Sequence, residues 1–393
     1  MKHPVVSALM SAAILLGVDH IAFAQSTVTD IVSFLVTNQS IRTGDAAQDR
    51  AAAEAARDAI TRALIVNLTS VPIATSSSGF LYRLNPQLGT VERATQSFGG
   101  FFVERAFAPG NGRATFGLSA SSASFHRLDD QDLRDGTFLT TANRFIDEPL
   151  PFETETLTLR VRSRSLTAFA SVGITDRFEL GAAVPFVRLE VEGQRVSLLR
   201  GETFLQASGS ATASGVADAA LRAKYTVLSM DDGGAAIAAE IRLPTGNEAN
   251  LLGAGEAGLR VFGIAALERG RLMLSGNAGI VRGGVSSELN AGAAAAVAAH
   301  PRLSLTAELL ARLVDELRPL VRSSQPHPTI RDVQTIRLGT DDNADGSTVA
   351  AGITGFKWNP GGTLVIGANL RWGFTTAGLT SPITPTLAFE YGF

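Results

Sequence analysis

The end of the chain alternates between apolar residues and small or polar residues with a period of two. Residues 363–374 read TLVIGANLRWGF, with an apolar side chain at every even position, and residues 383–393 read ITPTLAFEYGF, with one at every odd position. This period predicts two β-strands, each with one apolar and one polar face. Strands with an apolar face toward lipid, a polar face toward a lumen and aromatic rings at the interface are typical of a transmembrane β-barrel.

The start of the chain has the features of a secretory signal peptide. Lys2 and His3 precede an apolar run over residues 5–18, and Ala-Phe-Ala at 22–24 fits the small-x-small cleavage rule. We therefore expect residues 1–24 to be removed on export. No later stretch offers the roughly 18 uncharged apolar residues of a membrane helix. The exported protein is expected to be either soluble outside the inner membrane or a β-barrel in an outer membrane.

Composition narrows the possible functions. The 393 residues carry a formal net charge of -3, which gives no support to nucleic-acid binding, because that function requires a basic patch. The chain has no cysteine, which excludes disulfides, thiolate metal sites and cysteine nucleophiles. No motif indicates a cofactor, because the Gly-rich pieces lack the strand and helix that a phosphate-binding loop needs on either side.

Residues 25–110 differ in composition from the rest of the chain. Residues 49–71 predict a helix, because apolar side chains recur there at four-residue spacing: Ala56, Ile60, Leu64 and Leu68. Pro72 ends this pattern, and residues 76–110 are rich in Gly, Ser, Asn and Pro, which is typical of a connector. We predict a partly helical N-terminal extension. It either packs on another surface or lies in or below a lumen as a plug.

Residues 111–393 repeat the period-two pattern. Further alternating segments are 113–124, 166–174, 178–186, 217–227, 235–243, 259–267, 272–280, 289–299, 303–313 and, less regularly, 349–358. With the two C-terminal strands they predict an all-β fold, an antiparallel transmembrane β-barrel of about twelve strands. An even number returns the C-terminus to the side where the first strand begins, so the last strand is expected to pair with the first.

The connections between these segments alternate in length. Tight turns fall at 175–176, 231–234, 268–271, 300–301 and 359–362, and they use Asp, Gly, Asn and Pro. The other connections vary, and three of them are long and polar: 127–150, 196–214 and 315–345. This alternation is typical of outer-membrane barrels, whose short turns face the periplasm and whose long loops face outside.

The polar faces of the predicted strands carry charges of both signs. Twelve strands would enclose a lumen too wide for side chains alone to fill, so it must hold water, a plug or a substrate. These charges either form cross-strand ion pairs or provide a polar surface that selects permeants or binds the plug. The candidate lumen-lining residues are Asp218, Arg222, Lys224, Glu240, Arg242, Glu308, Arg312 and Arg371.

A predicted outer loop contains part of a calcium-binding motif. Asp341, Asn343, Asp345 and Gly346 match its opening, D-x-N-x-D-G. The closing Glu would fall at position 352, which is Gly, so the motif is incomplete. We therefore assign no metal site, and whether this loop binds a cation stays open.

Several segments resemble a family of outer-membrane barrels associated with phenol and aromatic meta-cleavage pathways. The resemblance rests on residues 173–186, 214–228, 242–255, 356–372 and 384–393, and on the connector over 76–106. Members of that family are described as transporters and are loosely similar to FadL-type importers of hydrophobic molecules. The resemblance implies a barrel and a transport role, and no set of catalytic residues comes with it.

These features together predict a channel for passive uptake of small hydrophobic or aromatic molecules, and no enzymatic activity. Its expected partners are outer-membrane lipid, the permeant and, during assembly, the barrel-assembly machinery, whose recognition signal the terminal Phe393 resembles. One alternative is a structural or interaction barrel that binds partners through the segments 127–150 and 315–345. The other is an outer-membrane lipid hydrolase that uses His126 beside Ser124.

Overall fold

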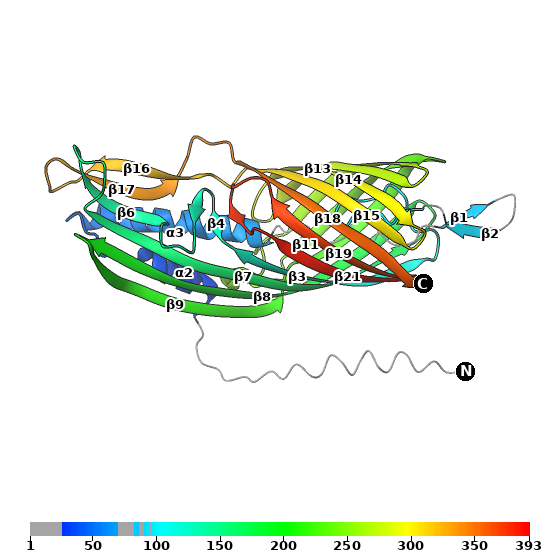
Figure 1. Ribbon diagram of the computed structural model, residues 1–393, viewed down its shortest axis with the longest axis horizontal. Coiled ribbons are helices and arrows are strands. Elements are labelled where there is room, and N and C mark those ends of the chain that lie inside the picture. Colours follow the sequence, from blue (N-terminus) through cyan, green and yellow to red (C-terminus); the bar gives the residue numbers. More distant parts are fainter. Residues whose placement is uncertain (1–25, 70–81, 86–89, 94–95) are drawn as a thin grey trace, which may run out of the picture.

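The computed structural model describes residues 26–69, 82–85, 90–93 and 96–393. The predicted signal peptide lies outside the described residues and stays a prediction. Most of the connector before residue 96 also lies outside the described residues. Its described part is a hairpin of β1 (Tyr82–Asn85) and β2 (Thr90–Arg93), which lies next to the short-turn end of the molecule (Figure 1).

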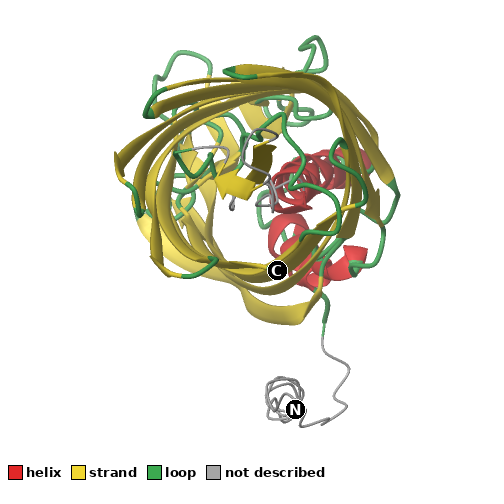
Figure 2. Cartoon of the chain, turned by 90° about the vertical axis from the view of Figure 1, so that its right-hand side faces the viewer, coloured by secondary structure: helices red, strands yellow, loops and turns green. Residues whose placement is uncertain are grey.

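Among the described residues, twelve strands pair antiparallel in a closed ring, which confirms the predicted fold class (Figures 1 and 2). The last strand pairs with the first, with Leu387 opposite Ala120, so the ring has no open edge. In order around the ring the strands are β3 (Ala114–Phe125), β7 (Glu153–Gly173), β8 (Phe178–Leu199), β10 (Ala219–Met230), β11 (Gly233–Leu243), β12 (Gly258–Arg269), β13 (Leu272–Gly283), β14 (Glu288–His300), β15 (Leu303–Val314), β18 (Ser347–Gly361), β19 (Leu364–Gly373) and β21 (Thr384–Gly392).

The barrel is apolar outside and polar inside. Leu180 on β8 and Leu221 on β10 point outward and are 41% and 51% exposed, whereas Glu179 and Lys224 on the same strands are buried. An apolar outer surface that runs around the ring is unfavourable in water and matches the hydrocarbon of a bilayer, where a closed barrel pairs every backbone polar group. The barrel is therefore a membrane-spanning unit.

Each of the three long segments predicted as loops contains strands, so the prediction that they are loops is wrong in this respect. β7 and β8 are 21 and 22 residues long and continue far beyond the ring. The sheet is extended by β6 (Leu139–Phe145), β17 (Val333–Thr340) and β16 (Leu320–Pro326) next to β7, and by β9 (Glu202–Val216) next to β8. A small separate sheet contains β4 (Arg127–Leu128), β5 (Gln131–Asp132) and β20 (Leu379–Thr380). We define the outer module as residues 26–69, 127–165, 187–216 and 315–345.

Two helices of the described chain lie against the concave face of this extended sheet, at the end opposite the C-terminus (Figure 1). They are α2 (Val28–Thr37) and α3 (Ala46–Thr69), and a short 3-10 turn, η2 (Glu248–Asn250), packs beside α2. α3 confirms the predicted helix. Its predicted apolar face is buried at Ala56, Ile60 and Leu64, with Leu68 half-buried against the same core. None of the described helices is long and apolar enough to cross a membrane.

A buried ion pair fixes α2 to the outer module. Arg195 on β8 and Glu155 on β7 lie 2.6 Å apart, and neither side chain is exposed. Arg195 also donates to the carbonyl oxygen of Val36 at 2.7 Å, in the last turn of the helix. Glu155 accepts a hydrogen bond from the Ser40 hydroxyl at 2.6 Å. These contacts satisfy helix-end groups that would otherwise be buried without partners.

Candidate functional site

Residues 96–108 lead into β3 and lie against the inner wall of the barrel; we call them the inner segment. Glu308 on β15 accepts hydrogen bonds from the three successive backbone N–H groups of residues 101–103, two of them at 3.0 and 2.9 Å. Lys357 on β18 donates to the carbonyl oxygen of Gly100 at 2.7 Å. The inner segment forms no helix or strand. Charged side chains of the wall therefore satisfy its buried backbone groups.

Ion pairs hold the inner segment on its other side. Glu104 pairs with Arg222 on β10. Lys224, also on β10, lies 2.7 Å from Glu179 on β8 and donates to the inner segment at the carbonyl oxygen of residue 105. The structure therefore places the predicted lumen residues Arg222, Lys224 and Glu308 inside the barrel, where they hold the inner segment.

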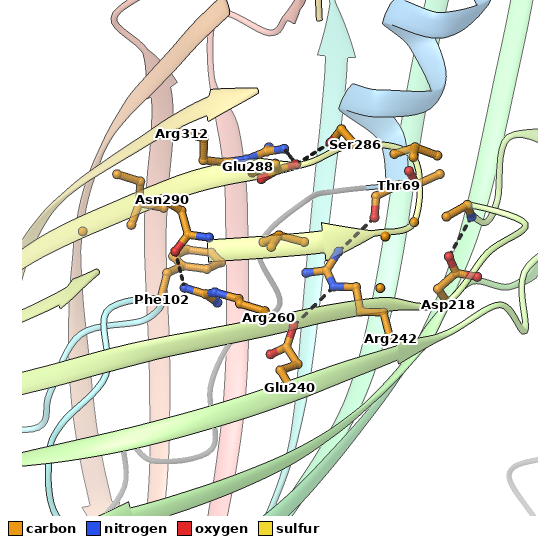
Figure 3. A pocket seen from close by; sticks show the side chains of 18 of the residues that line it. Thr69, Phe102, Asp218, Glu240, Arg242, Arg260, Ser286, Glu288, Asn290 and Arg312 are labelled. Atoms are coloured by element: carbon orange, nitrogen blue, oxygen red, sulfur yellow. Dashed lines mark hydrogen bonds and ion pairs between the residues drawn. The ribbon is translucent and has the colours of Figure 1, made fainter. Parts of the chain in front are cut away.

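A cavity lies between the inner segment and the C-terminal end of α3, along β11 to β15 (Figure 3). The empty volume of this cavity is about 950 Å³, a figure that includes solvent at its open side. Arg242 lies 3.3 Å from Glu240 and donates to the carbonyl oxygen of Thr69, the last residue of α3, at 3.0 Å. Arg312 makes two hydrogen bonds to Glu288, at 2.8 and 2.5 Å. The three predicted residues Glu240, Arg242 and Arg312 thus lie together on this wall.

A second cavity, of about 1030 Å³ with its solvent included, adjoins β3, β7, β8 and β21. Phe102 of the inner segment and Arg242 line both cavities. One part of the second wall consists of hydroxyl side chains: Ser119, Ser121, Ser163, Ser165, Thr167, Thr384 and Thr386. Another part is apolar: Leu68, Phe125, Val187, Leu189, Leu251 and Leu252. A cavity with two such faces suits a compact molecule that has an apolar body and a polar end.

Arg371 on β19 lines the second cavity and differs from the other predicted lumen residues. Within the described part of the chain, no carboxylate, carbonyl or hydroxyl group pairs with its guanidinium. The positive charge of Arg312 lies close enough to repel the guanidinium of Arg371. Both arginines also line a further pocket, which includes Trp372. A guanidinium has five N–H donors and no acceptor. Arg371 can therefore donate hydrogen bonds to an incoming molecule.

Asp218 lies at the rim of the barrel next to the outer module, where it has a structural role. Its carboxylate accepts hydrogen bonds from the backbone N–H groups of Gly246 at 3.0 Å and Ala254 at 2.7 Å. It therefore fixes the connection between β11 and β12. Both carboxylate oxygens are occupied by these bonds, although Asp218 also lines the two cavities.

The wall carries further charged residues that the predicted set omits. Arg260 stands between the outward Leu259 and Val261, and its guanidinium lies 4.2 Å from the ring centroid of Phe262. It also donates to Asn290 at 3.3 Å. The omitted residues are Glu179, Arg260, Glu288, Lys357 and Glu390, and each adjoins an outward apolar residue. The period-two rule therefore contained enough information to find them.

The proposed hydrolase pair is separated by a third residue. Arg134 donates to Ser124 Oγ at 3.0 Å and contacts His126 Nε2 at 2.5 Å. Burial and the charge of Arg134 lower the pKa of His126. The described contacts therefore join both residues to Arg134, and no hydrogen bond between Ser124 and His126 is found among them.

The incomplete calcium motif lies between β17 and β18. Asp341 Oδ1 accepts a hydrogen bond from the backbone N–H of Asn343 at 3.0 Å, and Asp342 pairs with Arg318 at 3.1 Å. Across the described ranges, no group of three or more His, Asp or Glu side chains is arranged to hold a metal ion.

Comparison with known proteins finds no matching family model and no match among curated proteins. Among solved structures, an outer membrane channel from Pseudomonas putida F1 is similar at 13% identity, over 73% of this chain and 98% of that one, with a TM-score of 0.47. OprB of Pseudomonas putida is similar at 9% identity, over 72% and 93%, with a TM-score of 0.29. LpxR from Salmonella typhimurium is similar at 12% identity, over 70% and 99%, with a TM-score of 0.32. The function proposed below therefore rests on the residues of this chain.

Proposed function

We propose that this protein is an outer-membrane channel for the passive passage of small, largely apolar or aromatic molecules. The observation that supports it is the pair of cavities inside a closed, lipid-facing barrel. The end of α3 bounds them on the side of the outer module, and the inner segment bounds them on the short-turn side. Because short turns of outer-membrane barrels face the periplasm, the cavities lie on the external side of the inner segment.

Passage through this barrel depends on the inner segment. Its backbone is held by the wall at Glu308, Lys357 and Lys224, and these hydrogen bonds can exchange with water when the segment moves. A permeant first enters between the hydroxyl and apolar parts of the second cavity, and its polar end meets Arg371. Displacement of the inner segment then connects the cavity with the periplasmic side.

Conductance in planar bilayers, and uptake into liposomes of a charged aromatic reporter that does not cross lipid unaided, test this function. Glu308→Ala removes the acceptor of three backbone N–H groups, so we expect a larger single-channel conductance and faster uptake than in the wild type. Glu190→Gln, which removes a negative charge from the outward face of β8, is the matched control and should change neither. The proposal fails if wild type and Glu308→Ala both show no conductance and no uptake.

A further inference from the structure

The outward face of β7 and β8 changes abruptly from apolar to basic. On β7 the outward apolar row ends at Leu166, and on β8 it ends at Phe186, its register partner. The next outward residues are Arg164 and Arg188, which again face each other across the two strands. Two like charges in directly opposed positions destabilise a strand pair unless an anion lies between them.

The position of this change coincides with the edge of the lipid. From Ile174 at the short turn to Leu166 on β7, the outward apolar row spans nine positions of the chain. A tilted strand crosses the hydrocarbon with about 9 to 11 residues. The next outward pair lies two residues further, or about 6.6 Å along the strand, and the headgroup layer on each side of the hydrocarbon is roughly 6 Å thick. Arg164 and Arg188 therefore lie at the level of the lipid headgroups in the external leaflet.

This surface has more positive than negative charge. Outward arginines follow at positions 160 and 162 on β7. Arg188 lies 2.9 Å from Glu190, and Arg160 lies 3.8 Å from Glu192. Within the described chain, neither Arg162 nor Arg164 has a hydrogen-bonded or ionic partner. The four arginines exceed the two glutamates by two charges, and two guanidinium groups remain available.

We propose that Arg162, Arg164 and Arg188 bind the phosphorylated headgroup of a lipid in the external leaflet. The planar guanidinium donates two parallel hydrogen bonds to a phosphate, and a phosphate between Arg164 and Arg188 relieves their repulsion. A shallow polar hollow continues from Arg162 across Glu190 to the hydroxyl groups of Ser210 and Thr212. These hydroxyls can bond the polar groups attached to the phosphate. The acyl chains would lie along Leu166 and Phe186 below.

Native mass spectrometry of the detergent-solubilised full chain tests this site, with a bis-phosphorylated glycolipid and its dephosphorylated form as probes. We expect the wild type to bind the phosphorylated probe at least tenfold more tightly than the dephosphorylated one. The double variant Arg162→Gln/Arg164→Gln should lose this preference. Arg271→Gln, which removes one positive charge at the short-turn end, should keep it. All three changed positions are on the surface, and a mobility shift of the folded barrel in unheated gels verifies that each variant is folded.

Two outcomes would overturn the proposal. The first is an unchanged preference for the phosphorylated probe in the double variant. The second is competition by millimolar inorganic phosphate that displaces the glycolipid completely, which would indicate a general anion site in place of a lipid site. Retention of the glycolipid in the presence of inorganic phosphate, together with its loss in the double variant, would support the lipid assignment.

Discussion

The barrel and the outer module share two strands but have opposite polarity. In the outer module, β7 points Leu157, Leu159 and Val161 inward onto the helices and carries Arg160 and Arg162 on its outer face. In the barrel, the same strand points serine and threonine inward and leucine, alanine and valine outward. The backbone is continuous across this change. The surrounding medium, water for one part and lipid for the other, therefore decides which face of a strand is apolar.

The two regions also use arginine differently. Arg195 of the outer module is fully buried and has a carboxylate and two carbonyl oxygens as partners. Arg371 of the barrel lines a cavity and has no partner in the described chain. A buried charge must be paired to be tolerated, whereas a charge beside water can stay free. Arg195 is thus a structural residue of the outer module, whereas the guanidinium of Arg371 has no partner among the described residues.

The largest loss of stability is expected in the outer module, from Arg195→Ala. This change leaves Glu155 buried without its counter-ion, which destabilises a fold by about 3–5 kcal/mol. We expect α2 to detach and the outer module to become sensitive to protease, while the barrel keeps its shape in lipid. Limited proteolysis with mass spectrometry, followed by hydrogen exchange of residues 28–37, measures this. Arg160→Ala removes an exposed pair and should cost less than about 1 kcal/mol. Loss of the barrel together with the outer module would show that the two regions are one cooperative unit.

A smaller effect is expected in the barrel from Val184→Arg. Val184 points outward near the middle of the apolar row of β8, where an arginine costs about 2–4 kcal/mol in a membrane barrel. Reversible folding into lipid vesicles, followed by tryptophan fluorescence in a urea titration, gives the difference in the free energy of unfolding. Ser208→Arg places the same side chain on the outward face of β9 in the outer module, where water surrounds it. An equal loss of unfolding free energy in Val184→Arg and Ser208→Arg would contradict the conclusion that lipid surrounds the barrel and water surrounds the outer module.

The same inversion explains what the sequence could and could not predict. Eleven of the twelve ring strands follow from a regular outward apolar row, which lipid requires, whereas β18 has Thr354 and Gly352 among its outward or small positions and is less regular. On β7 the apolar residues occupy even positions from Leu166 to the short turn, and odd positions from Val161 back to the start of the strand. A prediction based on a single apolar row therefore ends this strand near Leu166, although β7 begins at Glu153. The charged wall residues obey the same period, and Arg260 and Glu288 could have been found with it. The inner segment has no period, so its contacts with Glu308 could not be predicted.

Protonation of a buried carboxyl in the outer module is expected to have a smaller effect on the stability of this module. Burial alone would raise the pKa of Asp49 in α3, but hydrogen bonds from Thr43 and the charge of Arg337 on β17 outweigh it and hold this pKa below its usual value of 3.8. A carboxyl with a lowered pKa stabilises the fold above its unfolded-state pKa, and this contribution is lost as the pH falls below about 3.8. We expect α3 to become more sensitive to protease in that range. Asp49→Asn should reduce the dependence on pH and cost about 1 kcal/mol at neutral pH. An identical pH profile in the variant would contradict this role.

The smallest effect on stability, and a direct effect on function, is expected from Arg371→Gln. Because Arg371 has no partner in the described chain and adjoins Arg312, its removal breaks no ion pair, and we expect a change within about 0.5 kcal/mol. A unit charge 4 Å from an ion in water contributes about 1 kcal/mol, with opposite sign for an anion and a cation, so the anion-to-cation permeability ratio should fall by at most about 25-fold. The reversal potential in a salt gradient across a planar bilayer measures this ratio. Arg195→Gln, in the core of the outer module, is the contrasting variant: it should lower stability and leave the permeability ratio of the folded fraction unchanged. If the permeability ratio changed in Arg195→Gln and not in Arg371→Gln, the proposal that Arg371 is an unpaired charge beside the path of the permeant would be wrong.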